Sequence, residues 1–178
     1  MTDAILLADG ARPAVRLERD LPDPPLVVWQ AITDRAELRA WFPCDVIVED
    51  GAWRVGASIT FRFSPEDAEI ALTGEVLAVD EPKYLAYTWG DERLRFELSP
   101  QNGGTRLVLI NELAPDVAAR NAAGWDTCLD QLAGLAPAPE AWRPRFEVYS
   151  AEFEPVIGPQ QGPPLEDRGD ETSVSESA

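Results

Sequence analysis

The residue types that most often carry catalysis are scarce in this sequence. Its 178 residues include no histidine, so neither a Ser-His-Asp nor a Cys-His arrangement can form, and no histidine-ligated zinc or iron site is possible. A general acid or base would have to be a carboxylate, lysine, tyrosine or cysteine. Tyr84, Tyr87 and Glu75, which lie in expected strands, are the candidates for such a role.

The remaining reactive side chains favour no specific chemistry. Cys44 and Cys128 lie far apart in the sequence and belong to no CxxC motif, so we expect two reduced thiols. Acidic residues are plentiful, but they are spread over turns and solvent-facing positions rather than clustered. The glycines follow no phosphate-loop pattern. We therefore expect no catalytic residue, no metal and no cofactor.

The charge of the chain excludes two classes of partner. Fifteen Lys and Arg residues stand against 32 Asp and Glu residues, which gives a net charge of −17. Such a surface repels phosphate backbones and anionic headgroups, so we expect neither nucleic acid nor membrane as a partner. No apolar run approaches the roughly 18 residues of a membrane span. The N-terminus lacks the pattern of a secretion signal, and the few cysteines are typical of a cytoplasmic protein.

Hydrophobic periodicity predicts an α+β domain. A strand over 15–21 is followed by two short helices, one beginning near Pro24 and one ending before Pro43. Six segments with two-residue alternation then predict an antiparallel meander: 44–49, 57–63, 71–79, 84–89, 93–98 and 105–113. With the strand over 15–21, the sheet is expected to have seven strands. A long amphipathic helix over 116–135 comes last. The sheet and this helix each have one apolar face, so they must cover each other.

The segments on either side of the folded domain are expected to differ in structure. Residues 1–13 are expected to form an N-terminal arm, and residues 14–136 the folded domain. Residues 137–153 are expected to be a linker with room for one short extra helix over 141–153. The segment 154–178 is rich in Gly, Pro, Ser and acid and has nothing to bury, so we expect a disordered acidic tail.

The long helix carries its apolar residues on one stripe, which includes Trp125, Cys128 and Leu129. We expect this stripe to face the sheet, with Trp125 mostly buried, and Asp126 and Asp130 to lie on the opposite, solvent side. Gly124 lowers helix stability by about 1 kcal/mol relative to alanine. We interpret it as a place where the helix backbone approaches the sheet closely.

Four segments in this order resemble a known family: "VVWQAITDRAELRAWF", "GASITFRF", "TGEVLAVDEPKYLAYTW" and "GWDTCLDQL". They are similar to the START-like (SRPBCC) superfamily, and within it to the homologues of the activator of the 90-kDa heat-shock protein ATPase. The resemblance covers about residues 14–135. It implies a helix-grip fold, a curved seven-strand sheet around the long helix, with a cavity that commonly holds an apolar small molecule. The family has no universal catalytic residues, and chaperone activation is not inherited from its name.

The resulting hypothesis is binding of an apolar or amphipathic small molecule in the helix-grip cavity. Residues on the inner sheet face and the helix are the cavity candidates: Trp41, Phe61, Phe63, Tyr87, Trp89, Leu94, Phe96, Trp125, Cys128 and Leu129. Two alternatives stay open. One is a cyclase or hydrolase acting on a pocket-bound apolar substrate, and the other is a co-chaperone-like interaction module that works through the acidic tail.

Overall fold

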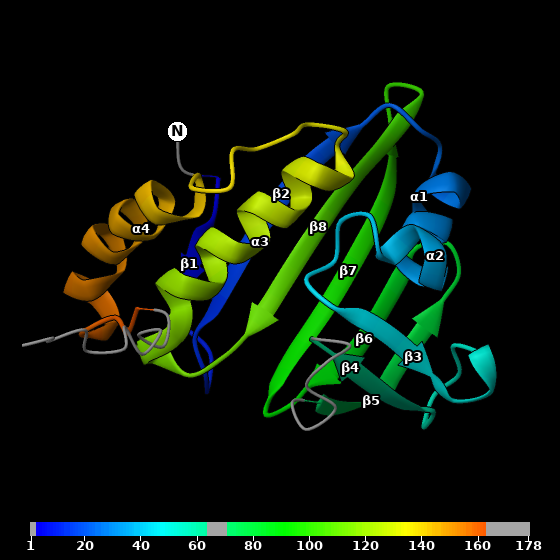
Figure 1. Ribbon diagram of the computed structural model, residues 1–178, viewed down its shortest axis with the longest axis horizontal. Coiled ribbons are helices and arrows are strands. Elements are labelled where there is room, and N and C mark those ends of the chain that lie inside the picture. Colours follow the sequence, from blue (N-terminus) through cyan, green and yellow to red (C-terminus); the bar gives the residue numbers. More distant parts are fainter. Residues whose placement is uncertain (1–2, 64–70, 163–178) are drawn as a thin grey trace, which may run out of the picture.

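The computed structural model describes residues 3–63 and 71–162, and it shows an eight-stranded antiparallel sheet packed against a long helix (Figure 1). The strand order is β1-β2-β8-β7-β6-β5-β4-β3. The strands are β1 (Ile5–Leu7), β2 (Ala14–Leu21), β3 (Asp45–Val48), β4 (Ser58–Arg62), β5 (Ala71–Asp80), β6 (Tyr84–Trp89), β7 (Glu92–Gln101) and β8 (Gly104–Glu112). The helices are α1 (Pro25–Thr33), α2 (Arg35–Leu38), α3 (Ala118–Leu132) and α4 (Trp142–Ile157), with short 3-10 turns η1 (Glu49–Gly51) and η2 (Pro115–Val117).

The helix-grip arrangement expected from the sequence is confirmed, with two differences in its elements. The sheet has an eighth strand, because β1 within the expected N-terminal arm pairs with β2 in the register Leu6 to Val15. The extra helix α4 extends to Ile157, so residues 154–157 are helical rather than part of a disordered tail. Residues 158–162 of that expected tail also contact the fold, since the Gln160 side chain accepts a hydrogen bond from the Ala119 amide at 2.9 Å. Residues 163–178 lie outside the described residues.

Local chemistry explains why α1 and α2 form where they do. Pro25 occupies the first turn of α1, where its missing N–H costs no hydrogen bond. Asp34 then caps α2, because its carboxylate accepts hydrogen bonds from the amides of Ala36 and Glu37. The Trp41 indole donates to the carbonyl of Ala31 at 2.9 Å and so ties the chain after α2 back to α1.

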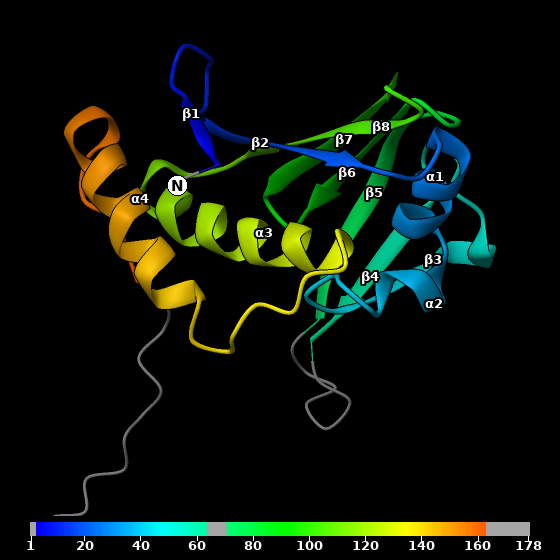
Figure 2. The same ribbon diagram turned by 90° about the horizontal axis from the view of Figure 1, so that it is seen from above.

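Helix α3 lies in the concavity of the curved sheet (Figure 2). Four alanines on α3, Ala118, Ala119, Ala122 and Ala123, are fully buried. Small side chains let a helix approach its neighbours closely, and α3 packs against both β2 and α4. Gly124 does not serve this purpose: a Cβ at that position would meet nothing within 4 Å. The expectation of a close approach at Gly124 is therefore wrong, and the alanines provide it.

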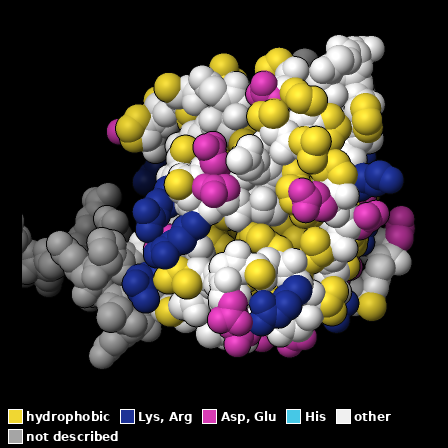
Figure 3. Space-filling model, turned by 90° about the vertical axis from the view of Figure 1, so that its right-hand side faces the viewer, with side chains coloured by type: hydrophobic (Ala, Val, Ile, Leu, Met, Phe, Trp, Pro, Cys, Tyr) yellow, Lys and Arg dark blue, Asp and Glu magenta, His cyan; other side chains and the backbone are white. Residues whose placement is uncertain are grey.

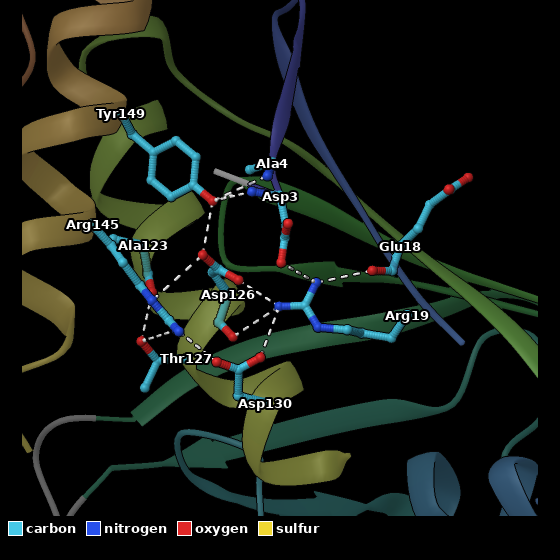
Figure 4. A network of polar contacts seen from close by, with 10 residues as sticks. All are labelled: Asp3, Ala4, Glu18, Arg19, Ala123, Asp126, Thr127, Asp130, Arg145 and Tyr149. Atoms are coloured by element: carbon cyan, nitrogen blue, oxygen red, sulfur yellow. Dashed lines mark hydrogen bonds and ion pairs between the residues drawn. The ribbon is translucent and has the colours of Figure 1, made fainter. Parts of the chain in front are cut away.

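The side of α3 that faces away from the aromatic interior carries an ion-pair network (Figure 4). Arg19 on β2 binds the carboxylates of Asp126 and Asp130, the latter at 3.1 Å. Arg145 on α4 binds Asp130 from the other side. The Tyr149 hydroxyl donates to Asp126 at 2.8 Å. Strand β2 and helix α4 are thus both joined to α3.

This network corrects one expectation about α3. Asp126 was placed on the solvent side, but its exposed fraction is only 3%. The cover comes from α4 and from the segment that leads into β1, where the amides of Asp3 and Ala4 donate to the Tyr149 hydroxyl at 3.1 and 3.0 Å. Burial of a carboxylate is tolerated here because Arg19 and Tyr149 supply its partners. Helix α3 is accordingly enclosed on two sides.

Candidate functional site

An inner aromatic cluster fills the space between α3 and the sheet. Its members come from the segment after α2, from three strands and from α3: Trp41, Phe42, Phe61, Tyr87, Trp89, Phe96 and Trp125. Ring centroids lie 4.6 Å apart for Phe61 and Trp89, and 5.4 Å apart for Phe42 and Trp125. These are the spacings of packed aromatic pairs. The centre of the expected cavity is therefore occupied by side chains.

The structure brings most of the cavity candidates together here. The fully or largely buried ones are Trp41, Phe61, Tyr87, Leu94, Phe96, Trp125 and Leu129. Trp89 and Cys128 are partly buried against the same core. Phe63 is 41% exposed, because it lies just past the end of β4, and it contacts the cluster through Trp89 at 5.6 Å. The burial of Trp125, at 5% exposure, agrees with the expectation from its helical spacing.

A polar group borders the cluster at the N-terminal half of α3. The Trp125 indole donates to the side-chain oxygen of Asn111 at 3.0 Å, and Asn111 is fully buried. The Asn111 amide nitrogen in turn donates to the carboxylate of Glu92 at 3.1 Å. Asn121 on α3 donates to both oxygens of the same carboxylate, at 3.0 and 3.1 Å. Glu92 is thus held in place from two elements.

Burial raises the pKa of the Glu92 carboxyl above its usual value, although the hydrogen bonds from Asn111 and Asn121 oppose that rise. Glu92 is not among the candidates expected from the sequence. A signal was present, since Glu92 is in phase with Leu94 and Phe96 on the inner face of β7. A charged residue in an otherwise apolar alternation indicates a buried polar contact.

The three acid–base candidates named from the sequence lie in three different parts of the structure. Tyr87 lies within the inner aromatic cluster, and its burial raises the pKa of its phenol. Tyr84 and Glu75 are not in the cluster. Tyr84 lines a shallow hollow of about 170 Å³ together with Arg93 and Ile110 on the outer face of the sheet. Glu75 is exposed. Only Tyr87 therefore lies beside the other cavity candidates.

The two thiols are free, as expected from their spacing. Burial raises the pKa of Cys44 to about 12 and that of Cys128 to about 11. A thiol with so high a pKa is almost entirely protonated near neutral pH, and the protonated form is a poor nucleophile. The two cysteines act here as small apolar side chains.

An open hollow of about 260 Å³ lies where α1 and the segment around α2 meet the last turn of α3. Its lining is Asp23, Val27, Gln30, Ala31, Glu37, Ala40, Trp41, Gln131 and Leu132. We call it the α1–α3 hollow. Trp41 also belongs to the inner aromatic cluster, where its ring lies 6.3 Å from that of Phe96. The hollow thus reaches the edge of the cluster.

The protein surface on the side of α1 and α2 is not uniformly polar. Figure 3 shows hydrophobic side chains gathered across the middle of this face, among acidic and basic ones. Large apolar side chains of α1 contribute to the exposed surface, with Leu26 at 64% and Val27 at 46% exposure. The α1–α3 hollow therefore has an apolar margin at Val27.

In residues 3–63 and 71–162, no three potential metal ligands come together in one group. No helix within those ranges has the length and apolar character that crossing a membrane requires.

Comparison with solved structures shows the same fold in several bacterial proteins. EF2215 from Enterococcus faecalis has 21% identity and a TM-score of 0.74, with 86% of this chain and 91% of that chain covered. CalU16 from Micromonospora echinospora has 19% identity and a TM-score of 0.66, with coverage of 85% and 94%. MLL2253 from Mesorhizobium loti has 27% identity and a TM-score of 0.57, with coverage of 68% and 94%.

No curated protein matches the chain. The family model described as "Activator of Hsp90 ATPase homolog 1-like protein" matches residues 23–136. That range runs from the start of α1 to just beyond the end of α3, and it therefore contains both the α1–α3 hollow and the inner aromatic cluster. The chain belongs to the family of proteins like activator of Hsp90 ATPase homolog 1.

Proposed function

We propose that this protein binds a small, largely apolar molecule at the α1–α3 hollow, with one side of the ligand against Trp41. The observation that carries the proposal is the hollow itself: about 260 Å³ of open space whose lining includes Val27, Trp41 and Leu132. Binding sites for small molecules are typically concave and mostly apolar, with a few polar groups, and span about 300–1,000 Å³. The hollow is slightly smaller than this range, and four of its nine lining residues are polar or charged. Its size favours a ligand of one or two rings.

The inner aromatic cluster supports this location over a deeper one. Its rings already contact one another, so a ligand in the centre would have to displace several of them. A ligand in the α1–α3 hollow needs no such repacking. It would contact the cluster only through Trp41.

The test uses 1-naphthylmethanol, a neutral two-ring probe, with binding measured by isothermal titration calorimetry. For about a dozen heavy atoms, we expect a dissociation constant of about 10 μM to 1 mM. Ala40→Trp should fill the hollow and weaken binding at least tenfold. Ala36→Trp is the matched control, because Ala36 is exposed on α2 and does not line the hollow.

Two results would reject the proposal. One is an absence of binding to the wild-type protein, and the other is equal affinity for the wild-type and Ala40→Trp proteins. Unchanged thermal unfolding of both tryptophan variants would show that they remain folded, so a loss of binding in Ala40→Trp alone would identify the hollow.

A second candidate function, acid–base catalysis on an apolar substrate, is favoured by Glu92. Its buried carboxyl has a raised pKa and is held by Asn111 and Asn121. A raised pKa makes the protonated form of a carboxyl more accessible than it is at the protein surface, and proton transfer by a positioned carboxyl is one form of general acid–base catalysis. Asn111 also accepts a hydrogen bond from the Trp125 indole, and so links Glu92 to the inner aromatic cluster.

This second function is tested by the hydrolysis of 4-nitrophenyl butyrate, an apolar ester. Activity above buffer in the wild-type protein should fall by about 100-fold in Glu92→Gln, as expected for loss of a general acid or base. Glu97→Gln is the control, because Glu97 is exposed on the same strand. No activity in the wild-type protein, or equal activity in Glu92→Gln, would exclude catalysis of this reaction by Glu92.

A further inference from the structure

The charged residues that line the α1–α3 hollow are both acidic. Its polar lining consists of the carboxylates of Asp23 and Glu37 and the amides of Gln30 and Gln131. Among the described residues, neither lysine nor arginine lines it. A bound molecule therefore meets negative charge and two amides that can donate or accept hydrogen bonds, with no cation among the lining residues to pair an acid group.

The carboxylates of the hollow are also available for a ligand. Within residues 3–63 and 71–162, the side chains of Asp23 and Glu37 form neither a hydrogen bond nor an ion pair. This contrasts with Asp126 and Asp130 on α3, which both bind arginines. The hollow thus combines an apolar margin with two unpaired negative charges.

The arginines nearest in sequence are engaged elsewhere. Arg35 and Arg39 flank Glu37, but both bind Asp45, at 2.7 and 3.3 Å. The hydrogen bond from Arg35 is the main reason that the pKa of Asp45 is lowered to about 2. Because Asp45 holds both guanidinium groups, neither neutralises the carboxylate of Glu37.

We propose that the ligand of the α1–α3 hollow is a hydrophobic amine, with its apolar part against Val27, Trp41 and Leu132 and its ammonium group beside Asp23 and Glu37. This inference rests on the proposed function, and it adds the chemical class of the ligand. An apolar carboxylate of the same size would meet repulsion at the same place. The net charge of −17 acts in the same direction over longer distances.

The test compares three probes that share two fused rings: 1-naphthylmethylamine, 1-naphthylmethanol and 1-naphthoate. At neutral pH these are a cation, a neutral molecule and an anion. Isothermal titration calorimetry at low ionic strength should show the amine binding about fivefold tighter than the alcohol, the scale of an exposed ion pair. The naphthoate should bind more weakly than the alcohol.

The double variant Asp23→Asn with Glu37→Gln separates local charge from overall charge. It should remove the preference for the amine and leave the affinity for the alcohol unchanged. The control is Asp9→Asn with Glu140→Gln, which changes the net charge equally at exposed positions outside the hollow. This control should keep the preference for the amine.

The outcomes distinguish the two proposals. If the alcohol binds but the amine binds no tighter, the amine inference is wrong and the proposed binding function stands. The same holds if the preference survives in the Asp23→Asn, Glu37→Gln variant. If no probe binds the wild-type protein, the binding function itself fails.

Discussion

Replacing Trp125 with alanine tests the central packing of the fold. Trp125 lies on the sheet-facing side of α3, is 5% exposed, and has ring centroids 5.4 Å from Phe42 and 5.8 Å from Trp89. Its indole N–H also satisfies the buried oxygen of Asn111 at 3.0 Å. Trp125→Ala therefore removes a large core side chain and leaves a buried acceptor without its donor.

The two losses have different sizes. Truncation of a buried tryptophan to alanine costs about 3–5 kcal/mol in the free energy of unfolding. An unsatisfied buried polar group costs about 1–3 kcal/mol. Because the cavity admits some relaxation around Asn111, we expect a total of about 4–6 kcal/mol for Trp125→Ala. Trp125→Phe keeps a ring and loses the donor, so we expect about 1–3 kcal/mol.

Urea denaturation followed by far-ultraviolet circular dichroism measures these values through the transition midpoint and slope. Leu135→Ala is the control, because Leu135 is 60% exposed beyond the end of α3 and should change stability by less than about 0.5 kcal/mol. A change of that small size for Trp125→Ala would refute the reasoning. It would mean that the sheet-facing side of α3 does not form the core.

Three further predictions follow from other contacts. Gly124→Ala should stabilise the protein by about 0.5–1 kcal/mol in urea denaturation, since the added Cβ meets nothing within 4 Å in a helix interior; a loss of stability would show a contact that the structure lacks. Tyr149→Phe should cost about 1–3 kcal/mol and speed amide hydrogen exchange at Ala4, because that amide loses its acceptor and Asp126 loses one of its donors; unchanged exchange would count against the role of the hydroxyl. Glu92 has a raised pKa in the folded state, so its contribution to stability is fully present below the unfolded-state pKa of about 4.3 and is lost as pH rises through the folded-state value. The free energy of unfolding, measured between about pH 4 and 7, should therefore fall less with pH in Glu92→Gln than in the wild-type protein, and parallel curves would contradict the assignment.

Burial and the groups around Glu92 shift the pKa of its carboxyl in opposite directions. Positive charge from Arg120 and Arg12 and hydrogen bonds from Asn111 and Asn121 all favour the ionised carboxylate. Burial opposes them and dominates, which is why the pKa is raised rather than lowered. Because the pKa is raised, Glu92 should make the protein less stable as the pH rises.

Alternation along the strands was sufficient to predict most of the sheet, because strands such as β4 and β7 have one buried face and one more exposed face. Strand β1 was missed because three residues, Ile5–Leu7, are too few to show a period. Its formation depends on β2 as a partner and on the hydrogen bonds from Asp3 and Ala4 to Tyr149. Contacts between residues so distant in sequence leave no local pattern.

The candidate site, like the fold, could be predicted from the sequence only in part. The inner aromatic cluster could be predicted in part, since Phe96 alternates with the polar neighbours Arg95 and Glu97 on its strand. The α1–α3 hollow could not, because it depends on where the last turn of α3 meets α1. Asp126 was misplaced for a related reason: helical periodicity shows which side of α3 is apolar, but it does not show that α4 covers the polar side.

The two sides of α3 differ in what holds them, and this difference bears on how a ligand gains access. On one side, Arg19 and Arg145 bind Asp126 and Asp130, so that moving α3 would separate buried charges from their partners. Breaking a buried ion pair costs about 3–5 kcal/mol. On the other side, the α1–α3 hollow separates the last turn of α3 from α1. A ligand in the open hollow would therefore leave these ion pairs intact. Helices α1 and α2 are themselves anchored by the buried side chains of Trp29, Ile32 and Leu38, so the hollow lies between elements that are held in two different ways.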